Sequence, residues 1–598
     1  MTSTSPSSSD TRRGGSWLLD ATPASDVLTP ERLSDEHRLI GRTAEAFVGS
    51  EILPNLGRLE LKDWGLAREL LVRAGRLGLL GADVPEAYGG VALDKVASLV
   101  IGDRIAQSAS FGATWGGQVN LTILPILLFG TPDQKNRYLP KLVTGELVGA
   151  YSLSESGSGS DALGAKTRAT RQPDGSFRLT GEKMWTTNGG FADVFIVFAK
   201  VDGEHFTAFI VERAFPGVSS GREEHKMGLH GSSTTPLILQ DARVPAENVL
   251  GEIGRGHKVA FNVLNYGRLK LGAMCAGGCR AAIGQSAAYA ADRRQFGQPI
   301  ASFGAIKHKL GEMVTRTYAM ESMLYRTAGA LDRWVERAAE TGPAEGAAVL
   351  EALEEFAVEA SIAKVGGSEV MDYVLDENIQ IHGGNGYVSD YPAERQYRDS
   401  RVNRIFEGTN EINRLLIPGM LVRRAIKGSL PLIPAARALQ DELIGPAAIE
   451  APGDAPLAQE TRTVAAFKKV ALMTLGTALQ TYGDKLSDEQ EVLMGAADIV
   501  IDTYSAESAL LRAQAALDGN AAAAAFHVDA ARTFINDAAA RVEVTARSAL
   551  AAMNEGDRLQ TMLAALRRLM KVTPVNTVAP RRRLANEAVS RRRYPFNA

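Results

Sequence analysis

The chain has 598 residues, of which 45% are hydrophobic and 23% are charged, so it is long enough and apolar enough to form several globular domains. Its net charge of −3 argues against binding to the phosphate backbone of nucleic acid as the main function. The longest apolar run, residues 121–129, is too short for a membrane span of about 20 residues, and the N-terminus lacks the apolar core of a signal peptide. We therefore expect a soluble protein of the cytoplasm.

The first half of the chain divides into three segments. Residues 1–33 begin with a Ser- and Thr-rich stretch, and we expect them to be disordered or extended. Apolar residues then recur at three- and four-residue spacing, as in Leu70, Leu71 and Ala74, which predicts an N-terminal helical domain over 34–150. In residues 151–255, short β-branched and aromatic runs alternate with Gly, Pro and Asp, so we expect a β domain of antiparallel strands.

The second half is predicted to be helical, with one interruption. A helical domain is expected over 256–427, and its first helix, near 258–293, contains several glycines. Glycine costs a helix about 1 kcal/mol relative to alanine, which favours close approach of another helix or a ligand, the alternative being local kinks. Prolines concentrated in 428–460 predict a linker that cannot continue a helix, and 461–598 are expected to form an additional helical domain. The fold class is thus mostly α with a central β domain.

Two cysteines, Cys275 and Cys279, lie one helical turn apart within the glycine-containing helix. A helix holds such a pair in poor geometry for a disulfide, and no further cysteine accompanies them to complete a metal site. A metal or redox pair is the alternative, but we expect buried, inert thiols.

Three segments could bind an anion or an aromatic cofactor. Gly and Ser residues in 151–161 could offer backbone N–H groups and hydroxyls, unless they form only a flexible surface loop. Trp185, in the stretch 183–190, could stack on a flat ring, although a core Trp in a hairpin is equally compatible with the pattern. The stretch 292–297 places arginines next to Phe296, which suits a pyrophosphate and a stacked base, or else solvated arginines at a helix end.

A fourth segment, residues 380–414, contains the candidate catalytic base. Two glycine-marked loops flank an Arg-rich stretch, and Glu407 stands directly after Ile405 and Phe406. We expect these two side chains to desolvate the carboxylate, which would raise its pKa toward the value that a general base needs near neutral pH. A helix-capping Glu is the alternative for an isolated residue of this type.

Together, these four segments resemble the acyl-CoA dehydrogenase family in order and separation, over residues 34–424. The helical extension after the proline-rich linker, and the stretch 241–251, resemble the very-long-chain branch. The resemblance implies a helical domain, a β-barrel-like middle domain, a four-helix bundle and an extra C-terminal helical domain. It also implies bound FAD and oxidation of the Cα–Cβ bond of an acyl-CoA to the trans-2-enoyl-CoA in fatty acid β-oxidation. Electrons would pass to an electron-transfer flavoprotein, and the extension implies a homodimer.

The resemblance also assigns residues around the flavin ring. Tyr151, Leu153 and Ser154 would border the ring. Trp185 would lie against one face of it, and Thr187 would hydrogen-bond near N5. The family commonly has Thr-Glu-Pro where this chain has Ser154-Glu155-Ser156, so we expect flavin binding to be kept with a looser loop.

The rest of the cofactor would be held by residues from two subunits. Ser160 would reach the cofactor or the CoA pyrophosphate, and Arg293 and Phe296 would bind the FAD of a neighbouring subunit. Thr409 and Glu411 would complete the pyrophosphate site, although many relatives have Gln or Asp at the second position. Close to the adenosine half, the resemblance places Gln380, Gly383 and Gly384.

On the substrate side, the resemblance implies that Asn265, Arg268 and Gly408 face the acyl-CoA, and that Ser160 also contacts it. Glu407 would remove the α-proton, and its backbone N–H would polarise the thioester carbonyl. Some branches of the family place the base on the long helix at the position of Gly267, which cannot serve, so Glu407 is the remaining candidate.

Two rival functions stay open at this point. An acyl-CoA oxidase would reoxidise the flavin with O₂ and release peroxide. A flavin-bound assembly protein or nucleic-acid-associated relative would have lost dehydrogenation, which the retained Glu407 and the near-neutral charge oppose. The Arg runs at 581–583 and 591–593 are expected to be solvated helix ends or subunit contacts, with peripheral contact to an anionic membrane as the alternative.

Overall fold

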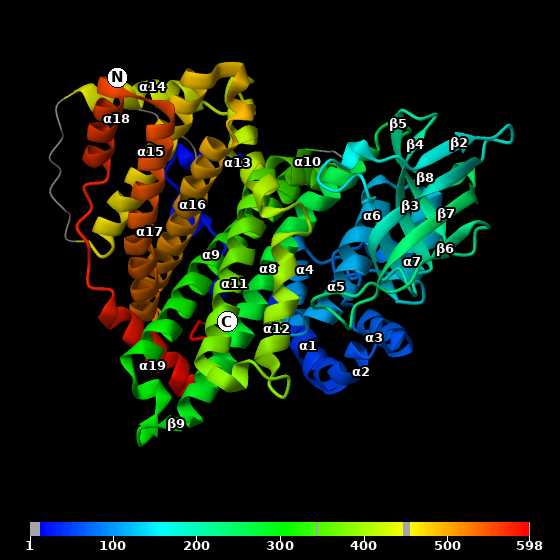
Figure 1. The fold of residues 1–598 in the computed structure, drawn as a ribbon, viewed down its shortest axis with the longest axis horizontal. Coiled ribbons are helices and arrows are strands. Elements are labelled where there is room, and N and C mark those ends of the chain that lie inside the picture. Colours follow the sequence, from blue (N-terminus) through cyan, green and yellow to red (C-terminus); the bar gives the residue numbers. More distant parts are fainter. Residues whose placement is uncertain (1–11, 342–344, 446–454, 597–598) are drawn as a thin grey trace.

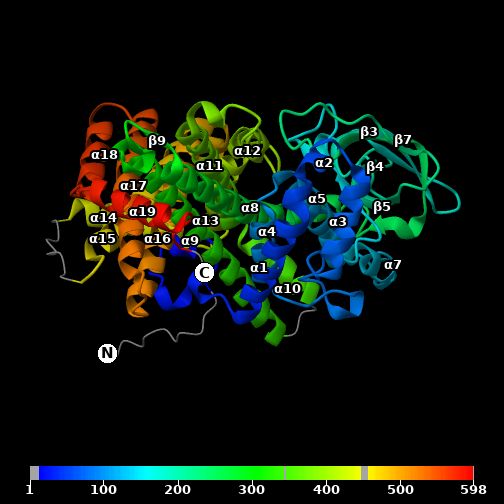
Figure 2. The same ribbon diagram turned by 90° about the horizontal axis from the view of Figure 1, so that it is seen from below.

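The computed structural model describes residues 12–341, 345–445 and 455–596. Figure 1 shows three regions in a row along the longest axis: C-terminal helices at one end, a central bundle of long helices, and the N-terminal helices with a β-sheet at the other end. The same order is seen from below in Figure 2, with α14–α18 and the sheet at opposite ends. Within the described residues, no helix is long and apolar enough to span a bilayer.

The N-terminal region is built from seven α-helices, several of which begin at a side-chain cap. Ser34 accepts a hydrogen bond from the His37 N–H at the start of α1, and Asp94 caps α4 in the same way through Ala97. The bounds are α1 (Asp35–Phe47), α2 (Leu56–Glu60), α3 (Trp64–Arg76), α4 (Lys95–Ile105), α5 (Ala109–Gln118), α6 (Leu124–Phe129) and α7 (Pro132–Val143).

Residues 12–33 differ from the expected disordered tail. Trp17, Leu18 and Leu33 are buried against the bundle, and the Trp17 indole N–H donates to Glu359 at 2.9 Å. Because such anchors lie among short 3₁₀ turns without helical periodicity, the sequence pattern did not reveal them. Residues 1–11, also part of the expected tail, lie outside the described residues.

The middle region is a sheet with strand order β6-β7-β3-β2-β4-β5-β8, in which β1 also pairs with β4. Contrary to the expectation of antiparallel pairing throughout, β4 runs parallel to both β1 and β2. Both faces of β4 are buried: Phe195 and Val197 face one cluster of core residues, and Ile196 and Phe198 face another. The bounds are β1 (Gly149–Ser152), β2 (Arg168–Arg171), β3 (Phe177–Thr187), β4 (Val194–Val201), β5 (His205–Glu212), β6 (Val218–Ser220), β7 (Thr234–Val244) and β8 (Val249–Leu250).

The central bundle explains the glycines of the long helix α8 (Gly256–Asp292). A Cβ at Gly277 would lie 1.8 Å from the Asp103 carbonyl oxygen of α4, and one at Gly267 would lie 2.8 Å from the Glu407 carboxylate. The glycines therefore permit close approach, as expected.

Cys275 and Cys279 are buried on the same helix, and burial raises the pKa of Cys275 to about 12, so the expected inert thiols are confirmed. The other elements are α9 (Gly304–Thr341), α10 (Glu345–Glu355), α11 (Ala357–His382), α12 (Pro392–Ser400), α13 (Asn410–Ile426) and the hairpin of β9 (Arg294–Gln295) and β10 (Gln298–Pro299).

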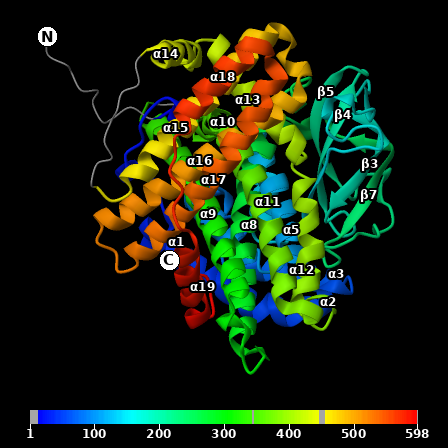
Figure 3. The same ribbon diagram turned by 60° about the vertical axis from the view of Figure 1, so that its left-hand side comes forward.

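The expected linker 428–460 contains a helix, α14 (Leu432–Ile444), seen near the top of Figure 3. Pro431 is its N-cap and Pro434 lies in its first turn, where a backbone N–H has no intrahelical partner, so neither proline breaks the helix. Residues 446–454 of this segment lie outside the described residues. The C-terminal helices are α15 (Ala458–Tyr482), α16 (Gln490–Asp518), α17 (Ala524–Met553), α18 (Gly556–Leu569) and α19 (Val578–Arg591).

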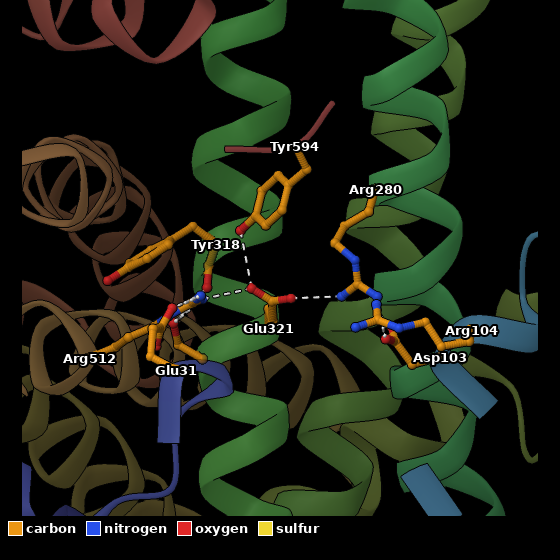
Figure 4. A network of polar contacts seen from close by, with 9 residues as sticks. Glu31, Asp103, Arg104, Arg280, Tyr318, Glu321, Arg512 and Tyr594 are labelled. Carbon is orange, nitrogen blue, oxygen red and sulfur yellow. Dashed lines mark hydrogen bonds and ion pairs between the residues drawn. The ribbon is translucent and has the colours of Figure 1, made fainter. Parts of the chain in front are cut away.

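Buried ion pairs join the C-terminal region to the bundle (Figure 4). The Glu321 carboxylate on α9 accepts hydrogen bonds from Arg512 of α16 at 2.8 Å, from Arg280 of α8 at 2.7 Å and from the Tyr594 hydroxyl at 3.3 Å. Arg280 also pairs with Asp103 of α4. One carboxylate thus ties the two helical regions and the C-terminal tail together.

The C-terminal arginine runs are largely engaged in intramolecular ion pairs. Arg581 is buried and pairs with Glu312 at 2.7 Å, so it is not the solvated residue that we expected. Arg583 pairs with Asp529 and Arg592 with Asp292, both at 2.6 Å. Because these arginines are paired with carboxylates of the same chain, their positive charges are less available for contact with an anionic membrane.

Candidate active site

Glu407 lies in the loop between the 3₁₀ turn Arg401–Arg404 and α13, and its carboxylate is buried against α8. Its backbone has φ 58°, a left-handed conformation that a non-glycine residue rarely adopts outside constrained sites. The side-chain amide of Asn413 holds the loop by donating to the carbonyl oxygens of Gly408 and Thr409 at 2.9 and 3.0 Å. The Oε2 atom of Glu407 is buried and has no hydrogen-bond partner.

Burial raises the pKa of Glu407 to about 7, although the charges of Arg268 and Lys364 act in the opposite direction. Neither cation forms an ion pair with the carboxylate. Arg268 donates from Nε to the Glu407 carbonyl oxygen at 3.3 Å and from a terminal nitrogen to Asn265 at 2.9 Å. Lys364 donates to the Asn410 side chain at 2.6 Å. The carboxylate is therefore desolvated but unpaired, which makes it a proton acceptor near neutral pH.

The physical reason that we gave for this raised pKa was partly wrong. Ile405 is 53% exposed and Phe406 is 37% exposed, so they do not enclose the carboxylate alone. The close neighbour is Gly267, together with Tyr151, whose pKa is raised by its own burial and by the nearby charge of Glu407. The residues around Glu407 in the sequence do not indicate that Gly267 of α8 and Tyr151 of β1 lie close to its carboxylate.

A cavity of about 90 Å³ opens beside Glu407, between α5 and α8. Four residues on one face of α5 present almost no side chain to it: Gly112, Ala113, Gly116 and Gly117. On α8, Gly267, Leu271 and Met274 form the opposite wall. The wall is apolar apart from the Asn120 and Asn403 side chains, so the cavity suits a hydrocarbon chain whose reactive end lies at Glu407.

Trp185 lies beside this site on an irregular part of β3. The pairing of β3 with β7 shifts register between Lys183 and Thr186, and Trp185 has φ 56°. Its side chain is 58% exposed, which excludes the alternative of a core Trp. The neighbouring Thr186 hydroxyl lies 2.6 Å from the Ser152 hydroxyl of β1, next to Tyr151. These contacts bring Trp185, Thr187, Tyr151 and Glu407 into one region of the molecule.

The loop 154–161 is fixed by a buried ion pair that sequence reasoning missed. The Glu155 carboxylate accepts from Lys183 Nζ at 2.7 Å and from the backbone N–H groups of Lys166 and Thr167 at 2.6 and 3.1 Å. The loop start, including Leu153 and Ser154, is therefore better anchored than we expected, while Ser160 stays exposed. The signal was present, because Glu155 lies within one segment and Lys183 begins the next.

Thr409 and Glu411 lie at the N-terminus of α13, directly after Glu407 and Gly408. The Thr409 hydroxyl accepts from the Ile412 N–H at 3.2 Å as the N-cap, and Glu411 is exposed. The remaining N–H groups of this first turn favour a negatively charged ligand. Thr409 can cap α13 and also lie next to a bound pyrophosphate.

The other predicted cofactor residues lie far from Glu407 within one chain. Arg293 and Phe296 follow the C-terminal end of α8, and Arg293 lies 26 residues after Gly267, which is about 39 Å along a helix. Phe296 is 92% exposed at the tip of the β9–β10 hairpin. Gln380, Gly383 and Gly384 end α11 close to this hairpin, where His382 stacks on Tyr289 with ring centroids 4.2 Å apart. The structure therefore divides the predicted residues into two groups.

These two groups fit a long cofactor with a flat ring at one end. The exposed Trp185 indole offers a stacking face, and the Tyr151 hydroxyl is buried with no hydrogen-bond partner in the described residues. A Cβ added at Gly383 or Gly384 would meet nothing within 4 Å, so this turn is open to a ligand. The donor set suits an aromatic ring and an anionic tail.

Family models of the acyl-CoA dehydrogenases match most of the chain. The model of the N-terminal domain matches residues 34–146, that of the middle domain matches 150–242, and two models of the C-terminal domain match 254–420 and 466–568. A probable acyl-CoA dehydrogenase of Bacillus subtilis (strain 168) is 48% identical over 578 residues, which cover 96% of this chain and 97% of that protein. The human mitochondrial very long-chain specific acyl-CoA dehydrogenase is 42% identical over 352 residues, 57% of this chain and 51% of that protein.

Solved structures agree. An acyl-CoA dehydrogenase complexed with FAD from Bacillus anthracis has a TM-score of 0.96 at 48% identity and covers 98% of this chain and 100% of its own. Butyryl-CoA dehydrogenase from Megasphaera elsdenii has a TM-score of 0.60 at 36% identity and covers 65% of this chain and 99% of its own. These matches confirm the expected fold class of helical, β and helical domains with a C-terminal helical extension. The chain belongs to the acyl-CoA dehydrogenase family.

Proposed function

We propose that this protein is an FAD-dependent dehydrogenase that converts a long-chain acyl-CoA to the trans-2-enoyl-CoA in fatty acid β-oxidation, with Glu407 as the base. The observation that carries the proposal is the Glu407 carboxylate at the end of an apolar cavity, with its Oε2 atom buried and without a hydrogen-bond partner. A base needs a pKa near the working pH, and burial gives Glu407 a pKa of about 7.

The chain's own residues would prepare the substrate for proton removal. The backbone N–H of Glu407 donates to the thioester carbonyl, which lowers the pKa of the α-proton. The carboxylate then removes that proton, and Arg268 and Lys364 stay close enough to stabilise its charged form before the reaction. Asn265 holds the Arg268 guanidinium in place at 2.9 Å. FAD, when bound, supplies the acceptor for the β-hydrogen, which leaves as hydride.

Two copies of the chain would complete each cofactor site. Trp185, Thr187 and the residues of 151–160 would hold the ring side of FAD, and Thr409 with Glu411 would lie toward the pyrophosphate. Since the exposed Arg293–Phe296 hairpin lies about 39 Å along α8 from Gly267, it serves the FAD of a second subunit, together with Gln380, Gly383 and Gly384. This supports a homodimer with composite sites.

Reduced FAD would pass its electrons to an electron-transfer flavoprotein.

The role of Glu407 is tested by anaerobic mixing of the FAD-loaded protein with a long-chain acyl-CoA, with the yellow absorbance of oxidised flavin as the readout. Wild type is expected to bleach, and Glu407→Gln is expected to stay yellow although it folds and binds FAD. Asp332→Asn is the matched control, because burial also raises the pKa of Asp332 to about 7, but its carboxylate accepts from the backbone of α4.

Bleaching of Glu407→Gln at the wild-type rate would dismiss Glu407 as the base. After bleaching, admission of air distinguishes the two electron acceptors. Slow reoxidation that a flavoprotein acceptor accelerates agrees with a dehydrogenase, whereas fast reoxidation with stoichiometric peroxide would identify an acyl-CoA oxidase.

A further inference from the structure

The helix that follows Glu407, α13, is the last helix of the central bundle and contacts the C-terminal helices α15–α19, here called the extension. Arg414, in the second turn of α13, donates from both terminal nitrogens to the Glu369 carboxylate of α11, at 2.6 and 2.8 Å. From Nε it donates to the Asp498 carboxylate of α16 at 2.8 Å. One guanidinium therefore binds a carboxylate of the bundle and a carboxylate of the extension at the same time.

The Glu369 carboxylate also contacts the first residue of α13. Its Oε1 atom accepts from the side-chain amide of Asn410 at 3.0 Å, and Asn410 is only 2% exposed. The Asn410 Oδ1 atom accepts in turn from Lys364 Nζ at 2.6 Å. Because Asn410 lies three residues after Glu407, these contacts fix the start of α13 directly behind the catalytic loop. The chain of contacts runs from Asp498 through Arg414 and Glu369 to Asn410.

The bundle and the extension do not pack continuously around this link. A cleft of about 610 Å³ lies between them, lined by α9, α11 and α13 on one side and by α16 and α17 on the other. Glu369, Arg414 and Asp498 lie in its wall. Side-chain packing is therefore interrupted here, and the ion pair between Arg414 and Asp498 is a contact of fixed geometry that joins α16 to α13.

We propose that the extension helps to position the catalytic base, with Asp498 as a positioning residue that acts through Arg414. The two carboxylates hold the guanidinium on two sides, and Glu369 is thereby held against Asn410. Asn410 fixes the first turn of α13 and with it the loop of Glu407, whose φ of 58° persists only where the surroundings hold it. The proposal rests on the function proposed above, in which Glu407 is the base.

The first test measures the loop itself and does not depend on activity. Amide hydrogen exchange of residues 405–413 is compared in the resting, FAD-loaded wild type and variants. We expect exchange to be about tenfold faster in Asp498→Ala, because the link to the extension is lost. Asp498→Asn should exchange at nearly the wild-type rate, since its side-chain carbonyl still accepts from Arg414 Nε.

Asp502→Ala is the matched control for both tests. Asp502 lies one turn further along α16 and pairs with Arg541 of α17 at 2.7 Å, so this ion pair stays within the extension. Both alanine variants lose one ion pair of the same helix. We expect Asp502→Ala to leave the exchange of 405–413 and the rate of flavin reduction unchanged.

The second test measures the single-turnover rate of flavin reduction at saturating acyl-CoA. A displacement of about 1 Å costs on the order of 10²-fold, and we expect that loss in Arg414→Met and about a tenth of it in Asp498→Ala, which keeps the pair of Arg414 with Glu369. The acyl-CoA concentration that gives half of the limiting rate should change by less than about twofold, because substrate contacts are kept. In the Arg414→Met background, Asp498→Ala should lower the rate by less than about twofold more, since Asp498 acts through Arg414.

The proposal requires both faster exchange and a lower rate in Asp498→Ala, so the absence of either overturns it. Equal effects of Asp498→Ala and Asp502→Ala would also overturn it, because any lost ion pair of α16 would then disturb the loop. Losses that multiply in the double variant would show that Asp498 does not act through Arg414. If acyl-CoA does not reduce the flavin of wild type, it is the proposed function that fails, and the exchange of 405–413 still decides whether the extension holds the loop.

Discussion

Two regions of this molecule bury a glutamate, and they do so in opposite ways. Where α9 meets α16, the Glu321 carboxylate receives hydrogen bonds from two arginines and a tyrosine (Figure 4). Where α5 meets α8, one oxygen of the Glu407 carboxylate has no partner at all. The comparison teaches that burial alone does not make an acid functional: full pairing gives a structural joint, and burial without pairing gives a proton acceptor.

The largest expected effect is at the paired glutamate. Arg512→Met removes one partner of Glu321 and also the arginine partner of Glu31, so both carboxylates lose a pair, and we expect the free energy of unfolding to fall by about 3–5 kcal/mol. Urea denaturation of the FAD-loaded protein measures this. Arg547→Met is the control, because its pair with Glu543 is 3.9 Å long and exposed, and we expect a change within about 0.5 kcal/mol. If the two variants lost the same free energy of unfolding, the buried ion pair would contribute no more stability than the exposed one.

The unpaired glutamate is expected to respond with the opposite sign. Its pKa is about 7 in the folded protein against 4.5 for the ordinary group, so folding favours its protonated form, and stability is lost as the pH rises from 4.5 through 7. Glu407→Gln removes that loss. We expect it to raise the free energy of unfolding by about 3 kcal/mol at pH 8.5 and by about half as much at pH 5.5.

Denaturation curves of wild type and Glu407→Gln at both pH values measure this difference. A destabilised Glu407→Gln at high pH would mean that the carboxylate has a favourable partner in solution. The comparison with Glu321 would then fail, because both acids would be paired.

The third expected effect concerns the close packing that keeps Glu407 in place. Gly267→Ala would put a methyl group 2.8 Å from the Glu407 carboxylate, so the carboxylate must shift. A displacement of about 1 Å costs on the order of 10²-fold in rate, and we expect that loss in the single-turnover rate of flavin reduction. On the same helix, Gly284→Ala would find its nearest neighbour at 3.5 Å and should leave the rate unchanged. If Gly267→Ala and Gly284→Ala reduced the flavin at the same rate, the exact position of the Glu407 carboxylate would not matter for the rate.

The sequence was sufficient for the plan of helical and β domains, because periodicity carries that information, while the role of Glu407 as the base stays a prediction. The residues around Glu407 were not sufficient for its surroundings. Gly267 precedes Glu407 by 140 residues, and only the family resemblance put that position at the same site, whereas the local segment wrongly indicated Ile405 and Phe406 as the cover of the carboxylate.

Other differences also come from contacts between distant segments. The Lys183–Glu155 pair joins two segments, 151–161 and 183–190, that we had considered separately. Trp17 is buried because Glu359, far along the chain, accepts from its indole. The helix α14 begins at prolines that we took for a linker, since a proline in the first turn is tolerated where a later one is not. In the first two cases a distant partner decided the outcome, whereas in α14 the local position of the prolines did.

The most direct test of the central claim is the pH dependence of flavin reduction by a saturating long-chain acyl-CoA, followed by stopped flow under anaerobic conditions. If Glu407 is the base, the rate should be low in acid and rise with pH through an apparent pKa near 7, as the buried carboxyl group loses its proton. Glu407→Gln should be inactive across the whole range. A wild-type rate that does not vary between about pH 5 and 9, or a Glu407→Gln variant with the wild-type profile, would contradict the account.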